Sequence, residues 1–123
     1  AIKHEGSASL RIQAQGEMVV PLLVLDSIDL ENATLIYEAV LKSEDLEGGA
    51  YLEMWCMFDG LGEYFSRGVD STISGNMDWI TVSTPFFLKQ GQNPSSVRLN
   101  LVITGPGTVW IDAIRLLKAE LPE

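Results

Sequence analysis

The chain has 123 residues, of which 46 % are hydrophobic, and this length suits a single domain with a two-sheet core. Seventeen acidic residues against eight basic ones give a formal net charge of -9, so the chain repels phosphates and nucleic-acid binding is disfavoured. The longest apolar stretch, residues 18–25, has about half the length of a membrane-spanning helix and contains Pro21, so no membrane span is expected. The single cysteine, Cys56, excludes an intrachain disulfide and a cysteine metal cage. The chain shows no secretory leader, but a mature or excised domain would have lost one, so the compartment stays open.

Strand-like runs alternate with turn residues, and no segment keeps the helical spacing of apolar residues over three turns. In chain order we expect strands over residues 8–15, 17–25, 34–42, 50–58, 79–88 and 97–104, then a closing strand after the glycine turn at 105–107. An acidic turn at 44–49, an aromatic segment around Tyr64 and Phe65, and loops at 71–78 and 89–96 lie between them. Pro21 predicts that the second strand lies at a sheet edge or carries a bulge. The chain is therefore predicted to be all-β.

The closing strand carries one break in its alternation. Val109 and Ile111 share one face, as do Ile114 and Leu116, but the two pairs are out of phase by one residue. This pattern predicts a β-bulge at Asp112-Ala113.

Period-two alternation assigns the other strand residues to two faces. One face is apolar and predicts a sandwich core made of Leu35, Tyr37, Ala39, Leu41, Leu52, Met54, Cys56, Phe58, Val82, Thr84, Phe86, Val97, Leu99, Leu101 and Ile103. The opposite face mixes aromatic, charged and amide groups and includes Glu38, Tyr51, Glu53, Trp55, Arg98 and Asn100. Aromatic rings cover the apolar C–H patches of sugars while charged and amide groups bond to hydroxyls, and protein contact surfaces are enriched in the same groups. The candidate partners are therefore a carbohydrate or a partner protein domain.

Four segments carry a resemblance to a known superfamily: the glycine-to-strand segment at 6–12, the stretch 41–50, Met77-Asp78-Trp79, and the closing segment 105–112. Together they resemble the galactose-binding-like jelly-roll domains, which include many carbohydrate-binding modules. The resemblance implies an antiparallel two-sheet jelly-roll β-sandwich. Domains of this kind usually carry another strand before the glycine-serine segment. Residues 1–123 are thus expected to be a single domain that lacks an N-terminal strand or has been excised from a larger protein.

The resemblance also implies a candidate metal ligand. Related modules often hold a buried calcium with the aspartate of the last strand, which corresponds to Asp112 here, so a structural calcium is the one cofactor to test. The alternative is that Asp112 only holds the bulge through hydrogen bonds to backbone amides.

Three functional hypotheses follow. The leading one is a non-catalytic module that binds carbohydrate through Tyr51, Glu53, Trp55, Arg98, Asn100 and Glu38. In this hypothesis Trp55 stacks on the ligand; the alternative is that its ring lies under a loop. Trp79 is instead expected to plug an edge of the core. The second hypothesis is a structural or protein-interaction β-sandwich without a small-molecule ligand. The weakest is a small glycoside hydrolase with Glu38 and Glu53 as paired carboxylates. The only histidine, His4, lies among N-terminal residues expected to fray, which argues against a Ser-His-Asp arrangement.

A jelly roll without its first strand would expose an unpaired edge, and such edges recruit strands from other chains unless something blocks them. Residues 18–25 form an apolar run that only Pro21 interrupts. We therefore expect either a homodimer that pairs through residues 18–25 or a domain whose missing strand comes from its parent protein.

Overall fold

The structure, a computed structural model, describes residues 3–5, 10–26, 33–88 and 93–120. Within these ranges the regular elements are strands, apart from the short 3-10 helix η1 (Val69–Ser71). The strands are β1 (Lys3–Glu5), β2 (Leu10–Ala14), β3 (Met18–Asp26), β4 (Ala33–Phe58), β5 (Gly62–Arg67), β6 (Ile73–Leu88), β7 (Ser96–Ile103) and β8 (Gly107–Ala119). The all-β prediction is confirmed. No helix in the described part of the chain is long and apolar enough to cross a membrane.

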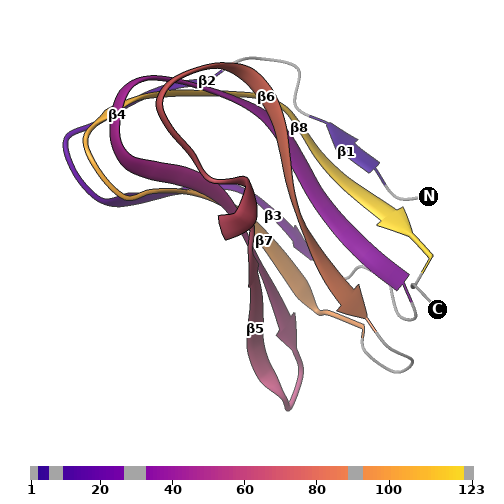
Figure 1. The fold of residues 1–123 in the computed structure, drawn as a ribbon. Coiled ribbons are helices and arrows are strands. Elements are labelled where there is room, and N and C mark those ends of the chain that lie inside the picture. The colour runs from indigo at the N-terminus through magenta and orange to yellow at the C-terminus, as the bar shows by residue number, and fades with distance from the viewer. Residues whose placement is uncertain (1–2, 6–9, 27–32, 89–92, 121–123) are drawn as a thin grey trace.

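Two layers of antiparallel strands face each other, and β4 belongs to both (Figure 1). The first half of β4 pairs with β6 on one side and β8 on the other, and β8 in turn pairs with β1 and β2. The second half of β4 pairs with β5 and β7, and β7 pairs with β3. Because β4 passes from one layer to the other, the sheet curls over on itself and encloses the core.

The bend of β4 corrects the expected acidic turn at 44–49. The chain stays paired with β6 through this stretch, with register shifts after Leu41, Ser43 and Leu46. Asp45 and Gly48 take positive φ angles of 51° and 76°, which let the strand turn without leaving the sheet. Strand pairing therefore continues where composition predicted a break.

The glycine turn before the closing strand packs directly on this bend. The backbone N–H of Glu47 donates to the carbonyl of Pro106 at 2.8 Å. A Cβ atom at Gly107, whose φ is 146°, would lie 2.5 Å from the Cα of Leu46. Glycine is needed at this position because the backbone of the turn touches the backbone of β4.

The start of β6 corrects two further expectations. Residues 71–78 were predicted to form a loop, but β6 already begins at Ile73, and Met77 pairs with Ser43. Trp79 consequently lies within a strand, beside a register shift, and is 42 % exposed. The prediction that Trp79 plugs the core is wrong.

The core follows the predicted alternation. The predicted core residues of β4 and β7 are buried, Val82 and Thr84 are buried in β6, and Phe86 packs partly buried against them. In β8 the register moves from Glu38–Arg115 to Val40–Asp112, so β8 carries one extra residue, and Ala113 has a φ of 51°. The predicted bulge at Asp112-Ala113 is confirmed.

The N-terminal residues and β3 define two edges. Lys3–Glu5 pair with Leu117–Arg115 of β8, so a short strand is present where the sequence predicted a missing one. Residues 6–9 of the resembling segment lie outside the described residues.

On the other layer, β3 pairs with β7 alone among the described strands, with a register shift between Pro21 and Leu23. Pro21 thus lies on an edge strand and at a bulge, as its lack of an N–H donor predicts.

Candidate functional site

The outer face of the layer β3-β7-β4-β5 brings together five of the six predicted ligand-binding residues. Trp55 pairs with Arg98 and Glu53 pairs with Asn100, while Tyr51 lies next along the same face of β4. Residues opposite each other in neighbouring strands point to the same side of the sheet. The alternate residues Leu52 and Met54 are buried in the core, so this set points outward.

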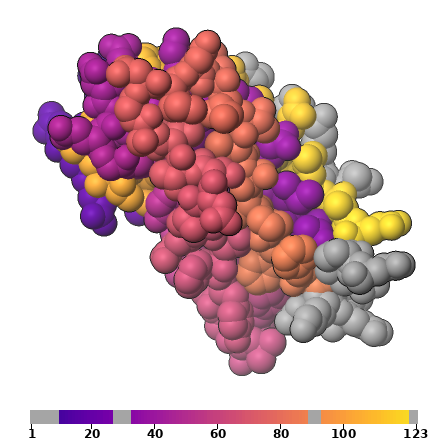
Figure 2. Space-filling view, viewed as in Figure 1, coloured from indigo at the N-terminus to yellow at the C-terminus, as the bar shows by residue number. Residues whose placement is uncertain are grey.

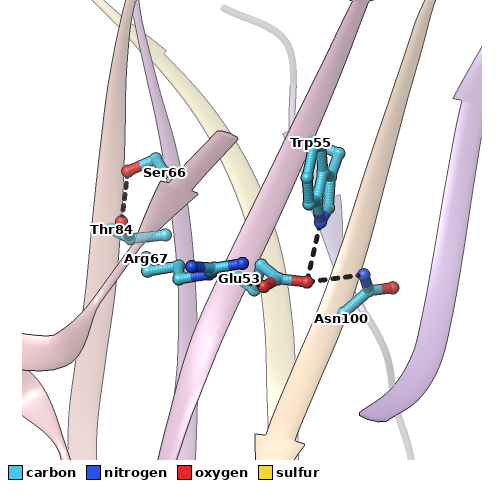
Figure 3. Close-up of polar contacts among 6 residues, drawn as sticks. All are labelled: Glu53, Trp55, Ser66, Arg67, Thr84 and Asn100. Atoms are coloured by element: carbon cyan, nitrogen blue, oxygen red, sulfur yellow. Dashed lines mark hydrogen bonds and ion pairs between the residues drawn. The ribbon is translucent and has the colours of Figure 1, made fainter. Parts of the chain in front are cut away.

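Strand β5 extends the face with residues that the sequence reasoning missed. Phe65 pairs with Trp55, Arg67 with Glu53, and Glu63 with Met57. A turn confined to Asp59-Gly60 would have placed Tyr64 opposite Trp55; the connection includes Leu61 as a third residue, so Phe65 lies there instead. The hydroxyl of Ser66 is hydrogen-bonded to Thr84 of β6, which anchors β5 on the side away from this face (Figure 3).

Glu53 is the centre of the polar network on this face (Figure 3). One of its carboxylate oxygens, Oε1, accepts from the indole Nε1 of Trp55 at 2.7 Å and from the amide Nδ2 of Asn100 at 3.2 Å. The other, Oε2, accepts from Nε of Arg67 at 2.8 Å. Glu53 is only 5 % exposed, and burial by itself raises the pKa of its carboxyl, but the hydrogen bonds from Arg67, Trp55 and Asn100 outweigh it and lower that pKa. Glu53 is therefore ionised and serves to hold its three donors in place.

Trp55 stands between two neighbours of the same sheet row. Its ring centroid lies 5.1 Å from that of Phe65, at an interplanar angle of 49°, and the guanidinium of Arg98 lies 5.8 Å from its ring. The side chain of Trp55 is half-buried. Phe65 is the more open ring, being 50 % exposed, with the guanidinium of Arg67 4.2 Å from its centroid.

The β4-β5 hairpin projects from the body of the molecule at the lower end of Figure 2. Leu61, Tyr64 and Phe65 on this hairpin are each at least half exposed. Part of the candidate site therefore lies on a protruding hairpin, and the rest lies on the neighbouring strands β4 and β7.

An ion pair joins β7 and β5 across the outer face of β4. Nη2 of Arg98 on β7 lies 2.5 Å from Oε2 of Glu63 on β5. Both guanidinium groups of the face are thus engaged by carboxylates, Arg67 by Glu53 and Arg98 by Glu63. We call the outward-facing set Tyr51, Glu53, Trp55, Glu63, Phe65, Arg67, Arg98 and Asn100 the aromatic face.

Glu38 lies elsewhere. It belongs to the first half of β4, between the buried residues Tyr37 and Ala39, so it points outward from the other layer. Its carboxylate lies 3.7 Å from Nη1 of Arg115. Glu38 and Glu53 therefore face opposite sides of the sandwich, and the structure does not bring together the carboxylate pair that a glycosidase would need.

Asp112 holds the bulge of β8. Its Oδ1 accepts a hydrogen bond from the backbone N–H of Ala113 at 2.7 Å, as the alternative interpretation of this residue describes. In the part of the chain that the structure describes, no group of three or more His, Cys, Asp or Glu side chains is placed to hold a metal ion. The nearby Trp110 lies within 6 Å of two cationic groups, those of Arg11 and Lys42.

The fold has counterparts among solved structures. No protein-family model matches the chain, and no curated protein matches it. A family 16 carbohydrate-binding module is similar with a TM-score of 0.60 at 11 % identity, over 89 % of this chain and 75 % of that one. A family 30 carbohydrate-binding module has a TM-score of 0.54 at 19 % identity, over 91 % and 76 %. A structure of infectious bursal disease virus, Gx strain, has a TM-score of 0.54 at 12 % identity, over 97 % of this chain and 37 % of that one. The chain thus has the β-sandwich fold of carbohydrate-binding modules, which confirms the predicted fold class.

Proposed function

We propose that the protein is a non-catalytic carbohydrate-binding module whose ligand lies across the aromatic face. The observation that carries this proposal is the Glu53 network, which fixes an indole, an amide and a guanidinium side by side on one exposed sheet face. Rigid aromatic and polar groups recognise sugars at little cost in conformational entropy. The likeness of the fold to carbohydrate-binding modules supports the same reading.

The contacts expected with a sugar depend on which atoms of the aromatic face are not already used within the protein. The N–H of Trp55 is used by Glu53, so this residue offers its ring edge and the part of its ring that Arg98 and Phe65 leave open. Phe65 offers the larger apolar surface for the C–H groups of a sugar ring. Asn100 donates Nδ2 to Glu53, which leaves its Oδ1 to accept from a sugar hydroxyl.

We further propose that the protein is not an enzyme. A glycoside hydrolase needs a carboxylic acid with a raised pKa beside a second carboxylate. The pKa of Glu53 is lowered and its oxygens are occupied by three donors, so it is a poor general acid.

A second candidate, docking of a protein domain on the same face, is favoured by the exposure of Val24 and Phe65, at 54 % and 50 %. A glycan array separates the two candidates. We expect the wild-type protein to bind at least one class of polysaccharide and Phe65→Ala to lose that binding with little change in melting temperature.

The matched control is Trp79→Ala, which removes an exposed aromatic ring from β6 in the other layer. We expect this variant to bind like the wild type. Binding that survives Phe65→Ala and Trp55→Ala would contradict the assignment to the aromatic face, and a complete lack of binding on the array would favour the docking candidate.

A further inference from the structure

The charges of the aromatic face are arranged in pairs. Arg67 is held by the buried Glu53, and Arg98 is held by Glu63, whose side chain is 33 % exposed. Val24 of β3 lies opposite Arg98, and Asp26 lies two residues further along β3, on the same face. Asp26 is exposed, so it adds a further carboxylate to this side of the layer. Among the described residues of this face, three carboxylates thus accompany two guanidinium groups, and each of these two guanidinium groups already has an anionic partner.

This pairing decides what an incoming ligand meets. A neutral sugar finds hydrogen-bonding groups without a net positive charge. A uronic acid finds Arg98 already bound to Glu63 at 2.5 Å, so its carboxylate would have to displace Glu63 or lie beside it. Like charges placed side by side are unfavourable, and the formal net charge of -9 adds a repulsive field.

Resting on the proposed function, we infer that Glu63 is a specificity-determining residue: by occupying Arg98 it restricts the aromatic face to uncharged glycans and rejects glycans that carry uronic acids. The ion pair is exposed, with Arg98 45 % and Glu63 33 % accessible, so it contributes little to folding and can be removed without loss of the fold. Without Glu63, the fork of Arg98 is free to bind a sugar carboxylate.

The experiment compares ligands that differ only in charge. Cellohexaose and mannohexaose are each titrated beside their C6-oxidised forms, in which hydroxymethyl groups are replaced by carboxylates, and binding is measured by calorimetry. For the wild type we expect each neutral oligosaccharide that binds to do so about tenfold or more tightly than its oxidised form, corresponding to a difference of about 1.4 kcal/mol. Higher salt should reduce this ratio, because exposed charges are screened.

Glu63→Gln should raise the affinity for the oxidised form about tenfold relative to the affinity for the neutral form. Glu17→Gln is the matched control: it changes the net charge equally, at an exposed position in the turn between β2 and β3. It should leave the ratio unchanged. In the double variant Glu63→Gln/Arg98→Gln the gain should disappear, since the two residues act as a pair.

An oxidised form that binds the wild type as well as its neutral parent would overturn the inference, and so would a gain that persists without Arg98 or that also appears in Glu17→Gln. These failures leave the proposed function intact, because a glycan still binds. Absence of binding by every oligosaccharide and every glycan on the array would refute the proposed function and this inference with it.

Discussion

Glu53→Ala should be among the most destabilising substitutions at residues outside the hydrophobic core of this protein. It removes a carboxylate that is 5 % exposed and accepts hydrogen bonds from Trp55, Asn100 and Arg67. Hydrogen bonds to a charged group contribute about 1.5–3 kcal/mol each, and they are not additive within one network. Because Trp55 and Asn100 are half-buried, water can replace part of what they lose. We expect a loss of about 2–4 kcal/mol in the free energy of unfolding.

This loss in the free energy of unfolding corresponds to a measurable decrease in the melting temperature. Unfolding entropies near 2.1 cal/mol/K per residue imply about 4 °C per kcal/mol for a chain of 123 residues, so the melting temperature should fall by roughly 8–16 °C. The control is Glu63→Ala, which breaks an exposed ion pair on the same face and should cost about 0–1 kcal/mol. Urea unfolding followed by tryptophan fluorescence measures both. A cost for Glu53→Ala within about 0.5 kcal/mol, the range of ordinary surface changes, would refute the reasoning.

The carboxyl group of Glu53 also makes the stability of the folded chain depend on pH. Its pKa is lower in the folded chain than its ordinary value of about 4.3, so the unfolded chain binds the proton more tightly. The stabilisation from Glu53 is therefore complete above that ordinary pKa and is lost as the pH falls through the lower, folded pKa. The stability of Glu53→Gln should fall less steeply than that of the wild type below about pH 4. Parallel curves for the two proteins would contradict this assignment.

Three other outcomes are expected. Leu101→Ala, which truncates a side chain with 0 % exposure in the core, should cost about 2–5 kcal/mol in urea unfolding, and a tolerated substitution would contradict the core assignment. Cys56 is buried, and burial raises the pKa of its thiol to about 12, so an aromatic disulfide reagent at pH 8 should label it only after denaturant is added. The exposed edge of β3 should pair with a second copy of the chain, giving a dimer in light scattering across a concentration series; a monomer at high micromolar concentration with slowly exchanging amides in residues 18–25 would contradict it.

The core could be predicted from the sequence because burial leaves a local signature. Leu52, Met54, Leu99 and Leu101 alternate with polar residues at period two, and every one of them is buried. The bulge of β8 was likewise visible as a shift of phase between Ile111 and Ile114.

The path of β4 between layers could not be predicted in the same way. Alternation tells which residues of a strand share a face, but it does not tell in which layer that strand lies. Glu38 and Glu53 both point away from the core, and they were grouped together for that reason. Since β4 bends between them, the two side chains emerge from opposite sides of the sandwich.

The burial of Glu53 could not be predicted from the sequence for a related reason. A glutamate on the outer side of a strand resembles a solvent-exposed ligand contact in any pattern based on alternation. Here Trp55, Arg67 and Asn100 from three strands close over it, so that it is less exposed than its position predicts. In the module that we propose, Glu53 therefore holds its neighbours in place, and ligand contact is expected from more exposed groups. Two of these, Phe65 and Glu63, come from β5, where the sequence offered only an aromatic segment without clear alternation. The residues that decide specificity on such a face are thus best sought among the exposed partners of its buried network.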